Sequence, residues 1–207
     1  FKQILMASGI ERYFQLALAF RDEDLRSDRQ PEHTQIDLEM SFVEEKDVHD
    51  LGEKMMRAVF KETLGVELET PFPSLDYSQA MKRYGSDKPD LRYGYEISDC
   101  SVLFKDSAFK VFGETVRSGG VVRGLKAAAE FSRADIDKLT DLVKALGAKG
   151  LAWIKWEAAG PASPIVKFMS PAEIKGLTDL FQMKTGEYLF FAADKELPAS
   201  TCLGALR

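Results

Sequence analysis

The chain has 207 residues, 45% of them hydrophobic and 29% charged, which is ordinary for a globular protein of one large or two small domains. Its net charge of −5 argues against a general nucleic-acid binder, although one local basic patch for RNA is compatible with it. Without a membrane-length apolar run, a secretory signal or metal-ligand spacing at Cys100 and Cys202, the sequence predicts a cytoplasmic protein with reduced thiols and no membrane partner.

Two segments near the N-terminus alternate apolar and polar residues with a period of two. In Arg12–Arg21 the apolar set is Phe14, Leu16, Leu18 and Phe20, and in Thr34–Phe42 it is Ile36, Leu38, Met40 and Phe42. This pattern predicts two half-buried strands that pair antiparallel. The connection Asp22–His33 is long and charged, and such connections are usually functional or disordered.

The opposite face of this strand pair is polar, and we considered it as a ligand site. Its large polar side chains are Gln15, Arg21, His33, Gln35, Asp37 and Glu39. Ala17 and Ala19 leave a shallow trough between them, which a solvated face does not require. The periodicity alone favours a ligand site and a solvated surface equally.

The remaining elements predict a small α+β arrangement of helices on a sheet. Helices are expected at about Lys46–Leu64 and Ser78–Tyr84, from the capping box at Ser132 and Asp135 to Gly147, and from Ser170-Pro171 onward. Strands are expected near Phe109–Val116, Val121–Ala128, Leu151–Trp156, Ile165–Phe168 and Tyr188–Ala193. Because Trp153 and Trp156 are three apart in a strand, they should face opposite sides of the sheet.

The loop between the first two strands carries a resemblance to a known family. Residues 20–37, FRDEDLRSDRQPEHTQID, resemble the second signature motif of the class II aminoacyl-tRNA synthetases and match the aspartyl enzymes almost residue for residue. That motif is an aromatic-Arg-x-Glu, a variable loop, then an Arg and an aromatic residue, across two antiparallel strands. The strand pair predicted from periodicity agrees with it.

The resemblance implies a role for each matching residue. Arg21 would be catalytic, binding the α-phosphate of ATP and the aspartate carboxylate with its paired donors. The implied ATP-binding set is Arg21, Asp22, Glu23, Gln30, His33 and Gln35, the aspartate-binding set is Lys2, Arg21 and Asp37, and Arg26 and Arg29 would meet the tRNA acceptor end. The family usually has Phe where this chain has His33, which can also stack on adenine or can be a surface histidine without a role.

The second half resembles an insertion, the GAD domain, found in bacterial aspartyl-tRNA synthetases and in a subunit of an archaeal amidotransferase. The matching stretches are Gly147–Lys155 and Tyr188–Asp194. The expected domains are therefore a partial class II catalytic core at 1–103, the GAD domain at 104–202 and a return to the core at 203–207. Because the chain begins with Phe1 and shows no first or third class II motif and no OB-fold, we expect it to be a fragment.

The resemblance implies an aspartate–tRNA ligase whose substrates are L-aspartate, ATP and tRNA(Asp). Mg²⁺ would accompany ATP with ligands outside this chain, which offers no metal site of its own, and the full-length enzyme would be a homodimer. One alternative is a non-catalytic tRNA-binding or interaction module. Another is an amidotransferase subunit, which the adenylate-type loop Arg21–Asp37 argues against.

Overall fold

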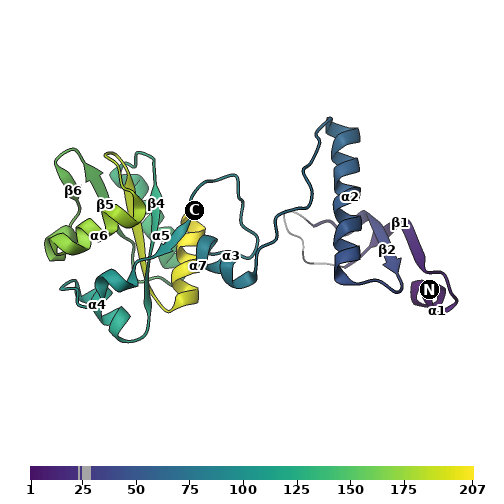
Figure 1. The fold of residues 1–207 in the computed structure, drawn as a ribbon, viewed down its shortest axis with the longest axis horizontal. Coiled ribbons are helices and arrows are strands. Elements are labelled where there is room, and N and C mark those ends of the chain that lie inside the picture. The colour runs from purple at the N-terminus through teal and green to yellow at the C-terminus, as the bar shows by residue number, and fades with distance from the viewer. Residues whose placement is uncertain (23, 25–28) are drawn as a thin grey trace. The chain divides into compact units, whose positions relative to one another are not determined.

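The structure is a computed structural model that describes residues 1–22, 24 and 29–207. The chain forms two compact units, Phe1–Ser74 and Leu75–Arg207, which are described separately (Figure 1). Residues 75–103 belong to the second unit, because β3 (Ile97–Asp99) pairs with β4 (Val121–Ala127) and α3 (Tyr77–Tyr84) packs on α7 (Glu196–Leu206). The domain boundary expected at residues 103 and 104 stays a prediction.

The first unit is built on one antiparallel hairpin. Strand β1 (Arg12–Phe20) pairs with β2 (Glu32–Met40) in a register that runs from Arg12 opposite Met40 to Phe20 opposite Glu32. A short helix, α1 (Lys2–Ala7), precedes the hairpin, and α2 (Glu45–Leu64) follows it. The predicted strands and long helix are confirmed, whereas α1 was not predicted.

Local signals define both ends of α2. At its start Glu44 and Asp47 form a capping box, in which the Glu44 amide donates to the Asp47 carboxylate at 2.9 Å. At its end Gly65 adopts a left-handed conformation with φ of 68°, and its amide donates to the Lys61 carbonyl at 3.0 Å. The helix therefore begins and ends where its sequence provides caps.

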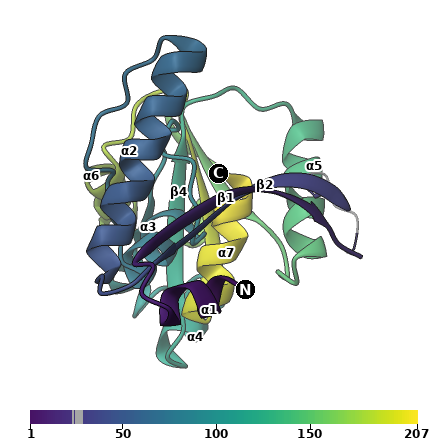
Figure 2. The same cartoon turned by 90° about the vertical axis from the view of Figure 1, so that its right-hand side faces the viewer.

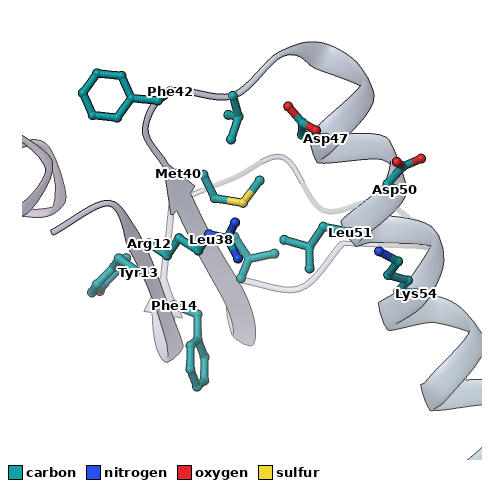
Figure 3. Close-up of a pocket in the computed structure, with 11 residues that line it drawn as sticks. Arg12, Tyr13, Phe14, Leu38, Met40, Phe42, Asp47, Asp50, Leu51 and Lys54 are labelled. Atoms are coloured by element: carbon teal, nitrogen blue, oxygen red, sulfur yellow. The ribbon is translucent and has the colours of Figure 1, made fainter.

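The apolar face of the hairpin is its exposed face. Phe14, Leu18 and Phe20 are 72%, 73% and 80% exposed, whereas the polar face is half-buried at Gln35, Asp37 and Glu39. The expectation that the apolar side would be covered is wrong for this chain, because Phe14, Leu18 and Phe20 stay mostly exposed in the described structure, although α2 and the turn before it line a hollow against Leu38 and Met40. Figure 3 shows Leu38 of β2 and Leu51 of α2 pointing toward one another. Exposed apolar surface that is contiguous along two strands is typical of an interaction site.

The second unit contains a five-stranded antiparallel sheet in the order β3-β4-β7-β5-β6. Its other strands are β5 (Ala152–Glu157), β6 (Gly160–Ala162) and β7 (Tyr188–Asp194). Its other helices are α4 (Lys110–Arg117), α5 (Arg133–Ala145) and α6 (Pro171–Phe181), with 3₁₀ turns η1 (Ser101–Phe104) and η2 (Val166–Phe168). The α+β fold class is confirmed.

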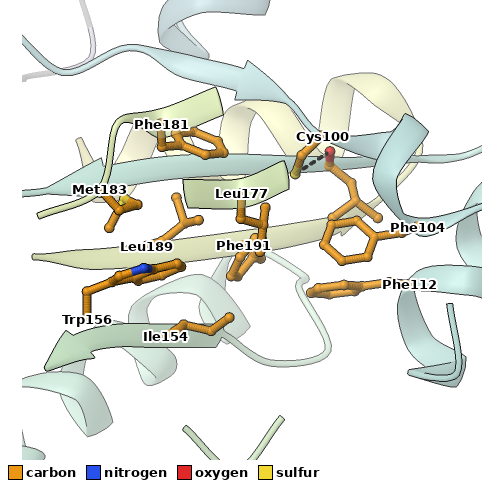
Figure 4. Close-up of a cluster of buried hydrophobic side chains, with 11 residues drawn as sticks. Cys100, Phe104, Phe112, Ile154, Trp156, Leu177, Phe181, Met183, Leu189 and Phe191 are labelled. Atoms are coloured by element: carbon orange, nitrogen blue, oxygen red, sulfur yellow. Dashed lines mark hydrogen bonds between the residues drawn. The ribbon is translucent and has the colours of Figure 1, made fainter. Parts of the chain in front are cut away.

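Helices cover both faces of this sheet and create two separate cores. On one face, Phe112 of α4 lies against Phe104 and Phe191 with ring centroids 4.8 and 5.3 Å away (Figure 4). On the other face, α5 and α7 pack on Tyr188 and Phe190 of β7. Trp156 belongs to the first core and Trp153 adjoins the second, which confirms that the two indoles face opposite sides.

Two predicted strands are wrong. Phe109–Val116 is almost entirely the helix α4, because Phe109, Phe112 and Val116 recur at helical spacing and all turn toward the same core. Ile165–Phe168 contains the 3₁₀ turn η2, in which the Phe168 amide donates to the Ile165 carbonyl at 3.0 Å. Aromatic and β-branched residues favour strands locally, and burial against the sheet overrides that preference.

A pair of glycines lets α3 and α7 come into contact. Gly85 ends α3 with φ of 69°, and a Cβ added there would lie 2.0 Å from the Ser200 carbonyl oxygen and 2.8 Å from the Gly204 Cα. Arg207 reinforces the contact by donating to the Tyr95 carbonyl at 2.6 Å and lying 4.7 Å from the Tyr84 ring centroid. The first and last segments of this unit are thus held together.

We predict that Gly85→Ala lowers the free energy of unfolding of the second unit by at least about 2 kcal/mol more than Gly119→Ala. Both glycines have positive φ, but a Cβ at Gly119 would meet nothing within 4 Å, so the comparison separates steric overlap from backbone strain. The chain's two tryptophans, Trp153 and Trp156, both lie in this unit, so fluorescence during urea denaturation reports on it. Equal losses of stability in the two variants would contradict the close packing.

Candidate functional site

Helix α1 places a lysine over the polar face of the hairpin. The Nζ atom of Lys2 lies 2.9 Å from Oδ1 of Asp37 and 2.9 Å from Oε1 of Glu39. Asp37 and Glu39 are alternate residues of β2, so their side chains lie on the same face. The ammonium group of a residue remote in sequence is therefore shared by two carboxylates of one strand.

These carboxylates change the acid–base behaviour of Lys2. Hydrogen bonds to Glu39 and then to Asp37 raise the pKa of Lys2 well above its ordinary value, against a smaller opposing effect of desolvation. Lys2 is consequently a stable cation at neutral pH. With Lys2 at 43% exposed and Asp37 and Glu39 at 18% and 33%, the charged groups stay accessible to a ligand.

The position of α1 follows from local contacts around the turn that leads into β1. Gly9 takes a left-handed conformation with φ of 95°, and the Ile10 amide donates to the Leu5 carbonyl at 3.1 Å. At the end of the hairpin, the Ser41 hydroxyl donates to Sδ of Met6 at 3.2 Å. Figure 2 shows α1 beside the end of the hairpin where β1 begins.

Arg21 lies further along the same face, directly after the end of β1 at Phe20. Its Nη2 donates to Oε1 of Gln35 at 3.1 Å, and its backbone amide donates to the Pro31 carbonyl at 2.8 Å. The small residues Ala17 and Ala19 stand opposite Gln35 and His33 in the register, which keeps the surface between the two cations low. The register places these small residues where the trough is expected, and the trough itself stays a prediction.

The structure brings some of the expected site residues together. Lys2, Asp37, Gln35 and Arg21 share the polar face through the contacts above, and His33 donates from Nδ1 to the Gln30 carbonyl at 3.3 Å. Asp22, Arg29 and Gln30 are exposed in the connection, and Glu23 and Arg26 lie outside the described residues.

Glu39 is the residue whose role the sequence reasoning missed. The alternating pattern puts it on the polar face without indicating a function, although its oxygen is as close to Lys2 as that of Asp37. Its position two residues after Asp37 was the available signal.

The hollow found in the first unit is not lined by the charged cluster of Lys2, Arg21, Asp37 and Glu39. It has a volume of about 730 Å³ and lies mainly between the apolar side of the hairpin and α2, lined by residues such as Leu38, Met40, Asp47 and Leu51 (Figure 3). In the described part of the chain, no group of His, Cys, Asp and Glu side chains is arranged to hold a metal ion. No helix found in that part is long and apolar enough to cross a bilayer.

The charged cluster fits a zwitterionic ligand with an additional acidic group. Lys2 and Arg21 offer cations to carboxylate or phosphate oxygens, and Arg21 can do so with two parallel N–H donors. Asp37 accepts from Lys2 through Oδ1, so its other oxygen can accept from a ligand ammonium group. At the Lys2 end of the face, apart from Arg21, the groups Lys2, Asp37 and Glu39 together leave one negative charge, which favours that ammonium group.

Comparisons with known proteins identify the family to which the chain is similar. Residues 1–192 match the family described as tRNA synthetases class II (D, K and N). The whole chain is 56% identical to the Aspartate–tRNA(Asp/Asn) ligase of Moorella thermoacetica, 54% to that of Natranaerobius thermophilus and 50% to the Aspartate–tRNA ligase of Geobacillus kaustophilus. The chain spans 35%, 36% and 36% of the lengths of these relatives.

We predict that Glu39→Gln moves the pKa of Lys2 down toward its ordinary value, and that Asp37→Asn does so to a smaller extent. Because the folded-state pKa is raised, the contribution of this cluster to stability is complete below the unfolded pKa and is lost as pH rises through the folded pKa. Titration of the Lys2 Cε resonance by NMR measures the shift. Glu32→Gln, at the other end of β2, is the control, and an unchanged Lys2 pKa in Glu39→Gln would contradict the cluster.

Proposed function

Because the chain belongs to the class II tRNA synthetase family of the D, K and N type, we propose that it is the part of an aspartate–tRNA ligase that binds aspartate and ATP. The observation that carries this proposal is the cluster of Lys2, Arg21, Asp37 and Glu39 on one face of the hairpin. Its charges complement the side-chain carboxylate, ammonium group and reacting carboxylate of aspartate.

In the proposed reaction, a carboxylate oxygen of aspartate attacks the α-phosphate of ATP, and pyrophosphate leaves. A hydroxyl group of the terminal tRNA ribose then attacks the aspartyl carbonyl carbon, and AMP leaves. Neither step needs a covalent intermediate with the enzyme, so the site acts by positioning and by stabilising charge. ATP enters with Mg²⁺, which neutralises phosphate charge and whose ligands we place outside residues 1–207.

The aspartate subsite rests on Lys2 and Asp37. Lys2 pairs with the substrate's side-chain carboxylate, and Asp37 accepts from its ammonium group. Glu39 acts through Lys2 as a positioning residue, since its oxygen 2.9 Å from Nζ keeps the ammonium group over the polar face. An asparagine side chain would offer Lys2 a neutral amide oxygen in place of a carboxylate, which weakens binding.

The ATP subsite continues toward the connection between the strands. Arg21 holds the α-phosphate, with its guanidinium oriented by Gln35 at 3.1 Å. His33 stacks on adenine, Glu23 accepts from the adenine amino group, and Asp22, Gln30 and Gln35 complete the subsite. Arg26 and Arg29 meet the acceptor end of tRNA(Asp). The full-length enzyme is proposed to be a homodimer.

The curated relatives differ in the tRNA that their names specify. The names of the Moorella and Natranaerobius proteins specify tRNA(Asp/Asn), whereas the name of the Geobacillus protein, Aspartate–tRNA ligase, does not specify which tRNA is charged. The polar face bears on the amino acid, which is the same in all three names. We therefore propose aspartate as the substrate and leave the choice of tRNA to the rest of the enzyme.

We predict that Arg21→Ala in the complete protein lowers aspartate-dependent pyrophosphate exchange by at least about a hundredfold, because a bidentate contact to the developing charge is lost. Arg12→Ala is the matched control, since Arg12 lies at the opposite end of the same strand. Near-normal exchange in Arg21→Ala, with the control also active, would refute the assignment of Arg21.

A further inference from the structure

The last residues of β7 have a strand on one side only. β4 pairs with β7 as far as Asp194, opposite Val121, whereas β5 pairs with it only from Tyr188 to Phe191. The segment 192–194 therefore continues past the start of β5 at Ala152. In the described structure this leaves a short open edge in the interior of the sheet.

The alternation of hydrogen bonds identifies which backbone groups face that edge. The Trp156 amide donates to the Glu187 carbonyl at 2.9 Å, so the backbone N–H and C=O groups of Trp156 point toward β7. Because the direction alternates along a strand, the same groups of Ile154 and Ala152, two and four residues earlier, also point toward β7. Their partners Leu189 and Phe191 must face β5 in return. The same alternation directs the N–H and C=O of Ala193 toward the open edge, where no described residue is seen to pair with them.

A groove of about 700 Å³ lies along this edge. One wall comes from α4, with Val111 and Thr115, and the other from the turn before β5, with Leu146 and Lys149. Ala193 and Cys202 also line it. Val111 and Leu146 are 56% and 57% exposed, so apolar side chains border the groove on both sides.

The surroundings define what would fill the groove. Helices line both faces of the sheet here, α4 on one side and α7 on the other, so an added strand would contact a helix on each face. A strand in that setting needs consecutive apolar residues rather than alternating ones. Glu114 and Asp194 outweigh Lys149 among the charged residues that line the groove, which favours basic residues beside the apolar stretch.

The geometry points to a peptide-binding site in the second unit. An extended segment with about three consecutive apolar residues and basic flanks adds to the sheet beside Ala193, in line with β5 and antiparallel to β7. Backbone hydrogen bonds to Ala193 fix its register, and the two walls receive its side chains. This site is separate from the proposed aspartate and ATP subsites, and its test is independent of them.

The probe is a fluorescein-labelled pentapeptide, Lys-Val-Leu-Val-Lys amide, titrated with the 207-residue chain and followed by anisotropy. Two isomers carry a single N-methyl group, one on the central Leu and one on the following Val. Because neighbouring residues of a strand direct their N–H groups to opposite sides, only one isomer loses a bond to β7. We expect that isomer to bind about tenfold more weakly than the other.

Variants of the chain locate the binding. Ser118→Trp places a large ring on the exposed α4 side of the groove and should weaken binding of the unmethylated peptide about tenfold, whereas Lys110→Trp adds the same ring outside the groove and should not. Both positions are exposed, so neither variant disturbs the core. Equal binding of the two N-methyl isomers, unchanged binding in Ser118→Trp, or no binding by the wild-type chain would each overturn the proposal.

Discussion

The candidate site of the first unit is organised around one ammonium group held between two carboxylates. Lys2 comes from a helix of six residues with no buried side chain of its own, and it reaches Asp37 and Glu39 on a strand some 35 positions later in the chain. A helix this short is marginal by itself, so its position depends on the turn at Gly9 and Ile10, on the Ser41–Met6 hydrogen bond and on that charge contact. The same contact brings a charged group from another element onto the polar face beside Asp37 and Glu39.

The two faces of the hairpin therefore differ in their contacts within the chain and in their exposure to solvent. The polar face is organised within the chain, by Lys2 at one end and by the Arg21–Gln35 hydrogen bond at the other. The apolar face, represented by Phe14, Leu18 and Phe20, is left open to solvent. The second unit contrasts with this, because β7 runs through the middle of its sheet between two packed cores. It has the internal packing of a complete domain.

The sequence predicts the hairpin and its polar face well, since a period of two fixes which side chains share a face. Periodicity says nothing about whether a face is covered, which is why the exposure of Phe14 and Leu18 was not anticipated. Helix α1 carries too few residues for a periodic signal, and the role of Glu39 depends on where α1 places Lys2. In the second unit, the aromatic and β-branched residues of Phe109–Val116 favour a strand locally and obscure a helical spacing that only the core reveals.

The central claim is that Lys2, held by Asp37 and Glu39, selects the side-chain carboxylate of aspartate. The most direct test is calorimetric titration of the complete protein with non-hydrolysable aspartyl- and asparaginyl-adenylate analogues, in the wild type and in Lys2→Gln. The account predicts a clear preference for the aspartyl analogue that largely disappears in Lys2→Gln. Equal binding of the two analogues by the wild type, or an unchanged preference in the variant, would contradict it.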